Sequence, residues 1–408
     1  MDKQKYIFLI IILGSLSALG PFSIDMYLPG FTAIAKDLHT TPNKVSLSLS
    51  SYFIGISAGQ LLYGPLLDRF GRKMPLYIGL TVYILASIGC ALTTNIDVFI
   101  ALRFVQAVGS CAAAVASMAM VRDLFPPQDS PKVFSLLLLV VGLSPMLAPT
   151  IGGYVILGFG WHFIFVILAF MGLAVLLASR FGLPHTRKPD HSISLKPKPI
   201  ITGFTKVFMH PQFYTYAVSG GIAFSGLFTY VAGSPILFMD IFKVSGETYG
   251  WIFAFMSISF IGVSQLNSVL LRKYNSEQLV YFGLALQCIV SIAFLIAAMN
   301  NWLDLYGTIA MLFLYLGCLG LTNPNTSGLS LAPFSNNAGS ASALLGAMQL
   351  GLGALASMAV GIFVKDSMIP MVVIMAGSTV LALIVLLIGR RNITVLTETT
   401  DTDNVMIH

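Results

Sequence analysis

The chain has 408 residues, of which 56% are hydrophobic and only 9% are charged. A soluble domain usually carries about 25% charged residues, so this chain lacks the polar residues that would cover a surface exposed to water. The composition therefore excludes an ordinary soluble protein and makes lipid the solvent for most of the surface. The net charge of +6 does not indicate nucleic-acid binding, because the basic residues gather at predicted membrane borders, where the positive-inside rule accounts for them.

Twelve apolar segments are long enough to cross a bilayer as helices, which takes about 20 residues each. We predict helices because a spanning segment must satisfy its own backbone, and these segments are too long for barrel strands. The first segment is also too long for a signal peptide, so we assign it as a membrane helix. The predicted fold class is an all-α membrane protein with twelve transmembrane helices at 6–35, 44–67, 75–94, 97–121, 133–157, 160–183, 212–239, 247–270, 277–299, 303–331, 337–364 and 367–389.

A stretch rich in proline, lysine and histidine separates the sixth and seventh spans and indicates a duplicated architecture. With the N-terminus placed inside, 17 of the 22 Lys and Arg residues lie on the inner side and 4 lie outside, so both termini are predicted to be cytoplasmic. We predict two six-helix bundles around a central cavity. The predicted parts are an N-terminal bundle at 1–183, a cytoplasmic linker at 184–211, a C-terminal bundle at 212–389 and a disordered cytoplasmic tail at 390–408.

Several function classes lack the residues that they would need. The sequence has no phosphate-binding loop and no soluble domain large enough for a nucleotide, so we expect no ATP and a gradient as the energy source. The four cysteines lie in apolar runs without metal-ligand spacing, and no cluster of His, Cys and carboxylates lies at membrane depth. We therefore predict a monomeric secondary transporter with no metal or cofactor, no catalytic residues and no nucleic-acid partner, and with only a small-molecule substrate and the bilayer as partners.

Asp25 and Arg103 are the charged residues that lie well inside predicted spans, where each charge is costly and marks a functional candidate. At 1.5 Å per residue, Asp25 lies about 28 Å from the inner end of the first span, and Arg103 about 9 Å below the outer end of the fourth. Both therefore lie in the outer half, at similar depth. We predict that Asp25 gains and loses the coupling proton, because an apolar cavity favours the neutral carboxyl and a nearby guanidinium favours the carboxylate. The alternative is a static ion pair that joins the two spans.

Polar and aromatic residues in several spans predict a substrate pocket. Gln106, Ser110 and Ser117 follow Arg103 at offsets of 3, 7 and 14 and so share one helical face. We predict that this face lines a water-filled cavity, and interhelical hydrogen bonding is the alternative. The remaining candidates describe a mostly apolar cavity with few polar groups, which suits amphipathic molecules better than sugars, and they are Tyr27, Tyr52, Phe53, Phe228, Tyr230, Ser234, Asn323 and Asn325.

Two segments carry candidate gating residues. The loop after the second span contains an acidic residue, Asp68, which could accept from basic side chains or helix N-termini and latch the inner gate in one state. The alternative is plain positive-inside charge, which explains the basic residues but not Asp68 or the glycines. Two prolines and two glycines in the fifth span predict a kinked helix with a close-packing face. The gating candidates are Gly64, Asp68, Arg69, Gly71, Arg72, Pro145, Pro149, Gly152 and Gly153.

These motifs resemble the major facilitator superfamily over nearly the whole chain. The loop Gly64–Lys73 matches the signature between its second and third helices, and Arg103, Gln106 and Gly109 match the RxxQxxG motif of its proton antiporters. The fifth span resembles the antiporter motif that ends in GPxxGG, although Ala148 replaces the first glycine. The departure leaves the prolines and the paired glycines in place.

Two further runs are similar to the Bcr/CflA drug-resistance subfamily. Its members show a TDMYLP stretch in the first helix, and this chain reads Ile24–Pro29 with Ile24 in place of the Thr. The run Tyr230–Pro235 also resembles that subfamily. The resemblance implies proton-driven efflux of drugs such as bicyclomycin or chloramphenicol-like compounds, in the inner membrane of a bacterium. Ser234 lies near where Asp25 would fall by internal symmetry, so we expect proton coupling to reside in the first half.

Two other functions stay open at this stage. An exporter or importer of a metabolite, such as a nucleoside or amino-acid derivative, would use the same scaffold. A membrane sensor or an embedded enzyme belongs to a different class, and the lack of a soluble domain and of a catalytic cluster argues against both.

Overall fold

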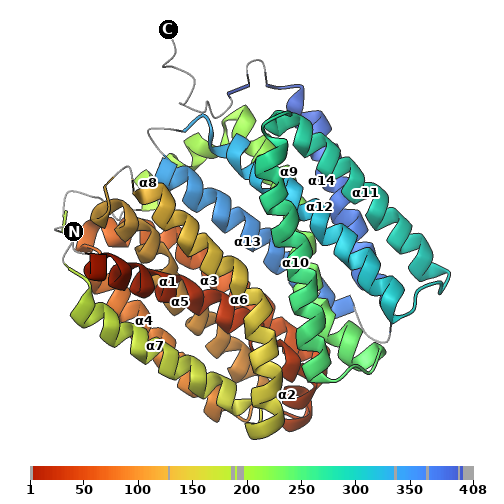
Figure 1. Cartoon of the computed structure of the whole chain (residues 1–408), viewed down its shortest axis with the longest axis horizontal. Coiled ribbons are helices and arrows are strands. Elements are labelled where there is room, and N and C mark those ends of the chain that lie inside the picture. The colour runs from red at the N-terminus through yellow and green to blue at the C-terminus, as the bar shows by residue number, and fades with distance from the viewer. Residues whose placement is uncertain are drawn as a thin grey trace.

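The computed structural model describes residues 3–126, 129–184, 189–190, 197–334, 338–363, 367–393 and 396–397. Within these residues the chain forms helices and no strands, and twelve helices are long and apolar enough to cross a membrane. The prediction of twelve spans is therefore confirmed by length and composition. Figure 1 shows the helices packed side by side in two groups, with the early helices in one and the late helices in the other.

The first half contributes six spans, and the first of these is not one continuous helix. Pro29 lacks the N–H that would bond the carbonyl of Asp25, so α1 ends at Asp25 and the span continues in two short helices. The elements of this half are α1 (Lys3–Asp25), η1 (Leu28–Gly30), α2 (Phe31–Asp37), α3 (Pro42–Phe70), α4 (Lys73–Leu92), α5 (Ile96–Leu124), α6 (Ser130–Phe159) and α7 (His162–Gly182).

The second half repeats this design, including a proline near the end of its first span. Pro235 cannot donate to the carbonyl of Val231, and the Ser234 hydroxyl lies 3.4 Å from that oxygen instead. The chain then continues as a π-helix. The elements are α9 (Pro211–Pro235), η2 (Ile236–Ile241), α10 (Gly246–Leu270), α11 (Ser276–Met299), α12 (Leu305–Leu331), α13 (Ala338–Phe363) and α14 (Ile369–Arg390). The predicted linker contains one more helix, α8 (Pro197–Phe208), which packs against α9 and α13.

The two halves meet along two helix pairs, α3 with α13 and α6 with α10. At the end that the predicted topology places outside, the Thr32 hydroxyl donates to Asp240 over 3.2 Å. At the same end, the Tyr154 hydroxyl donates to Glu247 over 2.9 Å. From these contacts α6 and α10 diverge toward the opposite end of the molecule (Figure 1). The described structure is therefore closed at the predicted outer end.

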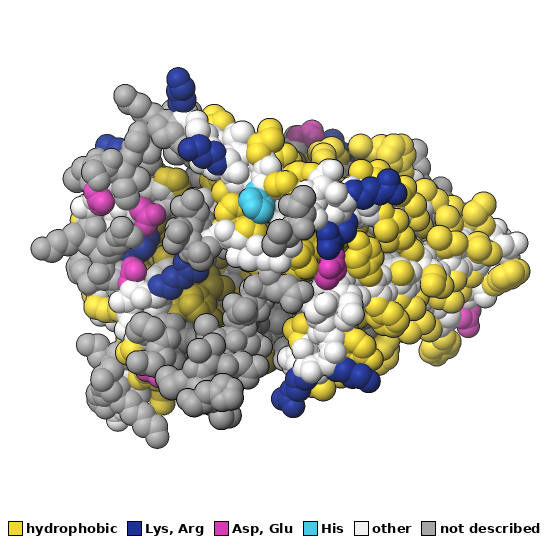
Figure 2. Space-filling view, turned by 90° about the horizontal axis from the view of Figure 1, so that it is seen from above, with side chains coloured by type: hydrophobic (Ala, Val, Ile, Leu, Met, Phe, Trp, Pro, Cys, Tyr) yellow, Lys and Arg dark blue, Asp and Glu magenta, His cyan; other side chains and the backbone are white. Residues whose placement is uncertain are grey.

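The surface carries the apolar side chains that a bilayer requires. Phe181, Leu92 and Tyr306 are 83%, 75% and 76% exposed, and many large hydrophobic side chains on other helices are also exposed. In Figure 2 hydrophobic side chains cover one side of the face with few charges among them, while the charged side chains are scattered over the rest of the face. Burial in lipid explains an exposed apolar area that would aggregate in water.

The C-terminal segment corrects one prediction. We expected disorder from residue 390 onward, but part of this segment docks on α9. The Gln212 amide, which is 1% exposed, donates to the carbonyls of Thr397 and Leu329 over 2.7 and 2.8 Å, and its oxygen accepts from the Thr397 N–H over 3.0 Å. A buried amide is stable only with partners, and the chain end supplies two of them. Residues 398–408 lie outside the described part.

This docking predicts a stability defect in Gln212→Leu. The substitution removes three hydrogen bonds and leaves the Leu329 carbonyl unpaired, so we expect a loss of about 2–3 kcal/mol. The melting temperature of the purified variant should fall, and limited proteolysis near the C-terminus should accelerate. Gln4→Leu makes the same chemical change at an exposed position and is the control. Equal melting temperatures for the two variants would contradict the docking.

Candidate functional site

The guanidinium of Arg103 is fully buried among aromatic rings. It lies 4.3 Å from the ring centroids of both Tyr27 and Tyr52. Its Nη2 donates to the backbone carbonyl of Ser23 over 2.9 Å, and its Nη1 donates to Gln106. Cation–π contacts and carbonyl oxygens can stabilise a desolvated guanidinium without a carboxylate. Arg103 thus links α5 to the last turn of α1, two residues before Asp25.

Asp25 is 5% exposed and lies where α1 ends. The ion pair with Arg103, which was the alternative to a proton-binding role, is not formed, because no described basic group lies within 4.0 Å of its carboxylate. The carboxylate also makes no hydrogen bond with any described residue. It lies instead within electrostatic range of Tyr230 and Tyr249 of the second half. Arg103 instead binds the backbone carbonyl of Ser23, two residues before Asp25.

The polar stripe on α5 also differs from its prediction. Gln106 donates to Ser87 over 2.7 Å. The Ser110 hydroxyl hydrogen-bonds that of Tyr52 over 2.8 Å, and Ser117 pairs with α1 at the same distance. All three stripe residues are at most 1% exposed. They join helices and do not line a water-filled cavity in this conformation, because a hydroxyl or amide packed between apolar helices must find its partner on a neighbouring helix.

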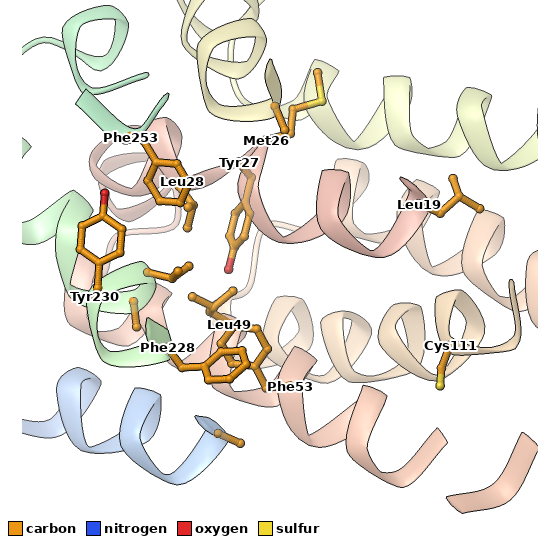
Figure 3. Close-up of a cluster of buried hydrophobic side chains, with 14 of the residues drawn as sticks. Leu19, Met26, Tyr27, Leu28, Leu49, Phe53, Cys111, Phe228, Tyr230 and Phe253 are labelled. Atoms are coloured by element: carbon orange, nitrogen blue, oxygen red, sulfur yellow. The ribbon is translucent and has the colours of Figure 1, made fainter. Parts of the chain in front are cut away.

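Three of the aromatic candidates, Phe53, Phe228 and Tyr230, lie where the two halves meet (Figure 3). Phe53 of α3 packs edge-on against Phe228 of α9, with 4.5 Å between ring centroids. Tyr230 stacks on Phe253, and its hydroxyl is buried without a hydrogen-bond partner. An unpaired buried hydroxyl is uncommon, so this oxygen has hydrogen-bonding capacity to spare for a ligand.

The other pocket candidates divide into structural and accessible groups. Ser234 is fully buried and hydrogen-bonds the Tyr249 hydroxyl over 2.9 Å. Asn325 is 2% exposed and donates to Asn267 and to the Leu321 carbonyl. Asn323 is only half-buried. Of these residues, Asn323 is the one that keeps part of its surface exposed.

The loop candidates form an ion-pair network within the first half. Arg72 lies 2.8 Å from Asp68 and 2.8 Å from Asp123, so it ties α3 and α4 to the end of α5. Gly71 adopts a φ of +78°, a backbone conformation that favours glycine, which explains its place at the end of α3. Asp123 was not among the predicted residues. It lies far from Arg72 in the sequence, and no sequence pattern indicates that the two side chains meet.

Two glycines of α6 allow very close backbone approach, Gly152 to the first span of its own half and Gly153 to the second half. A Cβ at Gly152 would overlap the backbone carbonyl of Met26, which directly follows Asp25. A Cβ at Gly153 would lie 2.9 Å from the Gly246 carbonyl of α10. Pro145 and Pro149 precede these glycines inside the same helix, as the sequence predicted. Gly153 therefore permits the closed outer end, and Gly152 permits α6 to pack on the first span.

Comparison with known proteins identifies the family. A model of the Major Facilitator Superfamily matches residues 13–358. The chain belongs to the Major Facilitator Superfamily. This family consists of transporters and is not an enzyme class, and the twelve apolar helices agree with a multi-pass inner-membrane protein.

Relatives and solved structures support this facilitator assignment. The bicyclomycin resistance protein homolog of Haemophilus influenzae is 32% identical over 94% of this chain and 96% of that protein. The multidrug resistance protein MdtL of Escherichia coli is 30% identical over 88% of this chain and 93% of that protein. These two relatives confirm the resemblance to the Bcr/CflA subfamily. Among solved structures, a D-xylose-proton symporter matches with a TM-score of 0.72 at 16% identity, covering 93% of this chain and 96% of that one, which shows the fold alone.

The close approach of Gly153 to α10 predicts that this facilitator cannot close its outer end when a side chain is added at Gly153. Ser50 of α3 is 1% exposed and hydrogen-bonds Ser357 of α13 where the two halves meet. In purified protein, Ser50→Cys should react slowly with a water-soluble maleimide, and Gly153→Leu should accelerate that reaction at least several-fold. Gly158→Leu is the control, because a Cβ there meets open space. Equal labelling rates in both backgrounds would contradict the proposed role of Gly153.

Proposed function

We propose that this transporter exports amphipathic drugs across a bacterial inner membrane in exchange for protons. The names of its relatives, a bicyclomycin resistance protein homolog and a multidrug resistance protein, support drugs as cargo. One observation carries the proton part of the proposal. Asp25 is buried where the two halves meet and has neither a counter-charge nor a hydrogen bond among the described residues.

An unpaired carboxylate in an apolar environment is costly, and either a proton or a polar group of the cargo removes that cost. Proton and cargo therefore compete for Asp25, so that binding of one releases the other. Tyr230 supports this role, because its unpartnered hydroxyl lies within electrostatic range of Asp25 and offers the cargo a second polar contact. In this proposal Arg103 is a positioning residue, since it holds the Ser23 carbonyl next to the helix break.

Alternating access follows from the two ends of the molecule. The positive-inside rule places both termini in the cytoplasm, so the closed end faces outward and the diverging end faces the cytoplasm, where an exporter loads its cargo. Gly153 would form the outer gate with α10, and Gly152 would hold α6 against the first span. The Arg72 network would hold the inner ends of the first half as a rigid body. The transporter would act as a monomer without ATP or any cofactor, with protons as the coupling ion.

Asp25→Asn tests the coupling directly. The amide is isosteric but cannot ionise, so we expect the variant to bind cargo without pH dependence and to lose uphill transport in proteoliposomes with a pH gradient. Wild-type affinity should rise with pH, by up to about tenfold per unit, because deprotonation frees the site for cargo. Asp97→Asn, at a carboxylate that is 72% exposed, is the matched control. Undiminished uphill transport by Asp25→Asn would refute the proposed role.

A growth panel tests the cargo. Overproduction of wild-type protein in a pump-deficient bacterium should raise resistance to several amphipathic antibiotics, bicyclomycin among them, and Asp25→Asn at equal abundance should not. The same protection by both proteins would dissociate resistance from proton coupling. Protection against none of the compounds would favour a natural metabolite as cargo.

A further inference from the structure

Four neutral polar side chains meet between α3, α12 and α13, and we call them the amide cluster: Gln60, Asn323, Ser327 and Gln349. The Gln349 amide donates to Asn323 over 3.1 Å and to Ser327 over 3.3 Å. Gln60 of the first half touches α13 one turn away, since a Cβ at Gly346 would overlap its amide. Only Asn323 of these four was a predicted pocket residue, because the four are dispersed over three helices and no pattern in the sequence connects them.

The amide cluster lies deep in the membrane and is still accessible. Gln60 is about 15 Å, Gln349 about 16 Å and Asn323 about 12 Å from the inner ends of their helices, at 1.5 Å per residue. All four members are only half-buried. Polar side chains at such depth face a bundle interior or an aqueous space, because lipid cannot satisfy them. The amide cluster therefore faces the space between the halves on the predicted cytoplasmic side.

The amide cluster adjoins the aromatic contact between the halves. Gln60 lies seven residues from Phe53 on α3, which places both side chains on one face, two turns apart. Phe53 packs against Phe228, whose ring also lies against Gly353 of α13. Gly353 lies four residues from Gln349, again on one face. An apolar aromatic surface and a neutral polar surface thus border the same space.

The amide cluster also has unused hydrogen-bonding groups. An amide offers two donor hydrogens and an acceptor oxygen. Gln60 makes no hydrogen bond with any described residue, and the Asn323 nitrogen and the Gln349 oxygen are likewise unused. Asn325 is the contrast, because it is buried and its amide nitrogen is engaged by two acceptors. The free donors and acceptors carry no charge, so they fit neutral amide, carbonyl or hydroxyl groups.

We propose that the amide cluster is a substrate subsite that binds neutral hydrogen-bonding groups of the cargo, while Phe53 and Phe228 contact its apolar part. This inference rests on the proposed function and narrows its substrate class. A neutral compound with several amide and hydroxyl groups should depend on the amide cluster. An apolar cation without hydrogen-bonding groups should not.

Equilibrium binding to purified protein, without a proton gradient, tests this proposal. The probes are bicyclomycin, which is neutral and rich in amide and hydroxyl groups, and tetraphenylphosphonium, which has no hydrogen-bonding group. We expect Gln349→Leu and Gln60→Leu each to weaken bicyclomycin binding about tenfold, the effect of one lost hydrogen bond. Binding of tetraphenylphosphonium should change less than twofold. Gln4→Leu is the control and should bind both probes like wild type.

Each other outcome overturns the proposal in a distinct way. Equal weakening of both probes, or unchanged bicyclomycin binding in both variants, would assign the amide cluster a structural role. Wild-type binding of tetraphenylphosphonium but not of bicyclomycin would refute the subsite and leave drug export standing. Binding of neither probe would refute both. If Gln349→Leu fails to fold, Gln60→Leu decides, because Gln60 makes no internal hydrogen bond that the substitution could break.

Discussion

A polar group in a membrane must be satisfied by another polar group, and the arrangement of this transporter follows from that constraint. Arg103 shows how a full charge meets it, with tyrosine faces on two sides, a backbone carbonyl and an amide oxygen as partners. Asp25 lies only two residues along the chain from the carbonyl that Arg103 binds, but its carboxylate has no such partner among the described residues. The Arg103 charge therefore stabilises the structure, whereas the Asp25 carboxylate remains available to a proton or a ligand.

The same constraint explains the breaks in the first span of each half. In each half a proline lacks the N–H that would bond a carbonyl one turn earlier in the helix. The regular helix therefore stops next to Asp25 in the first half and next to Ser234 in the second. Interruptions at corresponding positions of two repeats are typical of substrate sites in duplicated transporters. Gly152 of α6 packs on the backbone directly after Asp25, and Gly153 packs on α10. Movement of α6 and α10 would therefore change the surroundings of the carboxylate, which couples the outer gate to the proposed proton site.

The two halves differ in the chemistry that they place in their interiors. The first half buries Arg103 and Asp25. At a comparable place the second half has a neutral network, in which the Tyr315 hydroxyl hydrogen-bonds Thr379 over 3.1 Å. Most of the amide cluster also belongs to the second half. We infer that the first half binds and releases the proton, and that the second half supplies neutral contacts to the cargo.

The sequence by itself determined the twelve spans, the prolines and glycines of α6 and the two interior charges, because hydropathy, helix length and the cost of a buried charge are local properties. It could not determine which side chains meet. The alternative of an Asp25–Arg103 ion pair, the predicted water-lined stripe of Gln106 and the predicted disordered tail from residue 390 all depended on helix rotation and on contacts between distant segments. Only the tertiary structure placed Gln60 near Gln349 and left Asp25 unpaired, since packing of twelve similar apolar helices is decided by surface shape and close glycine contacts.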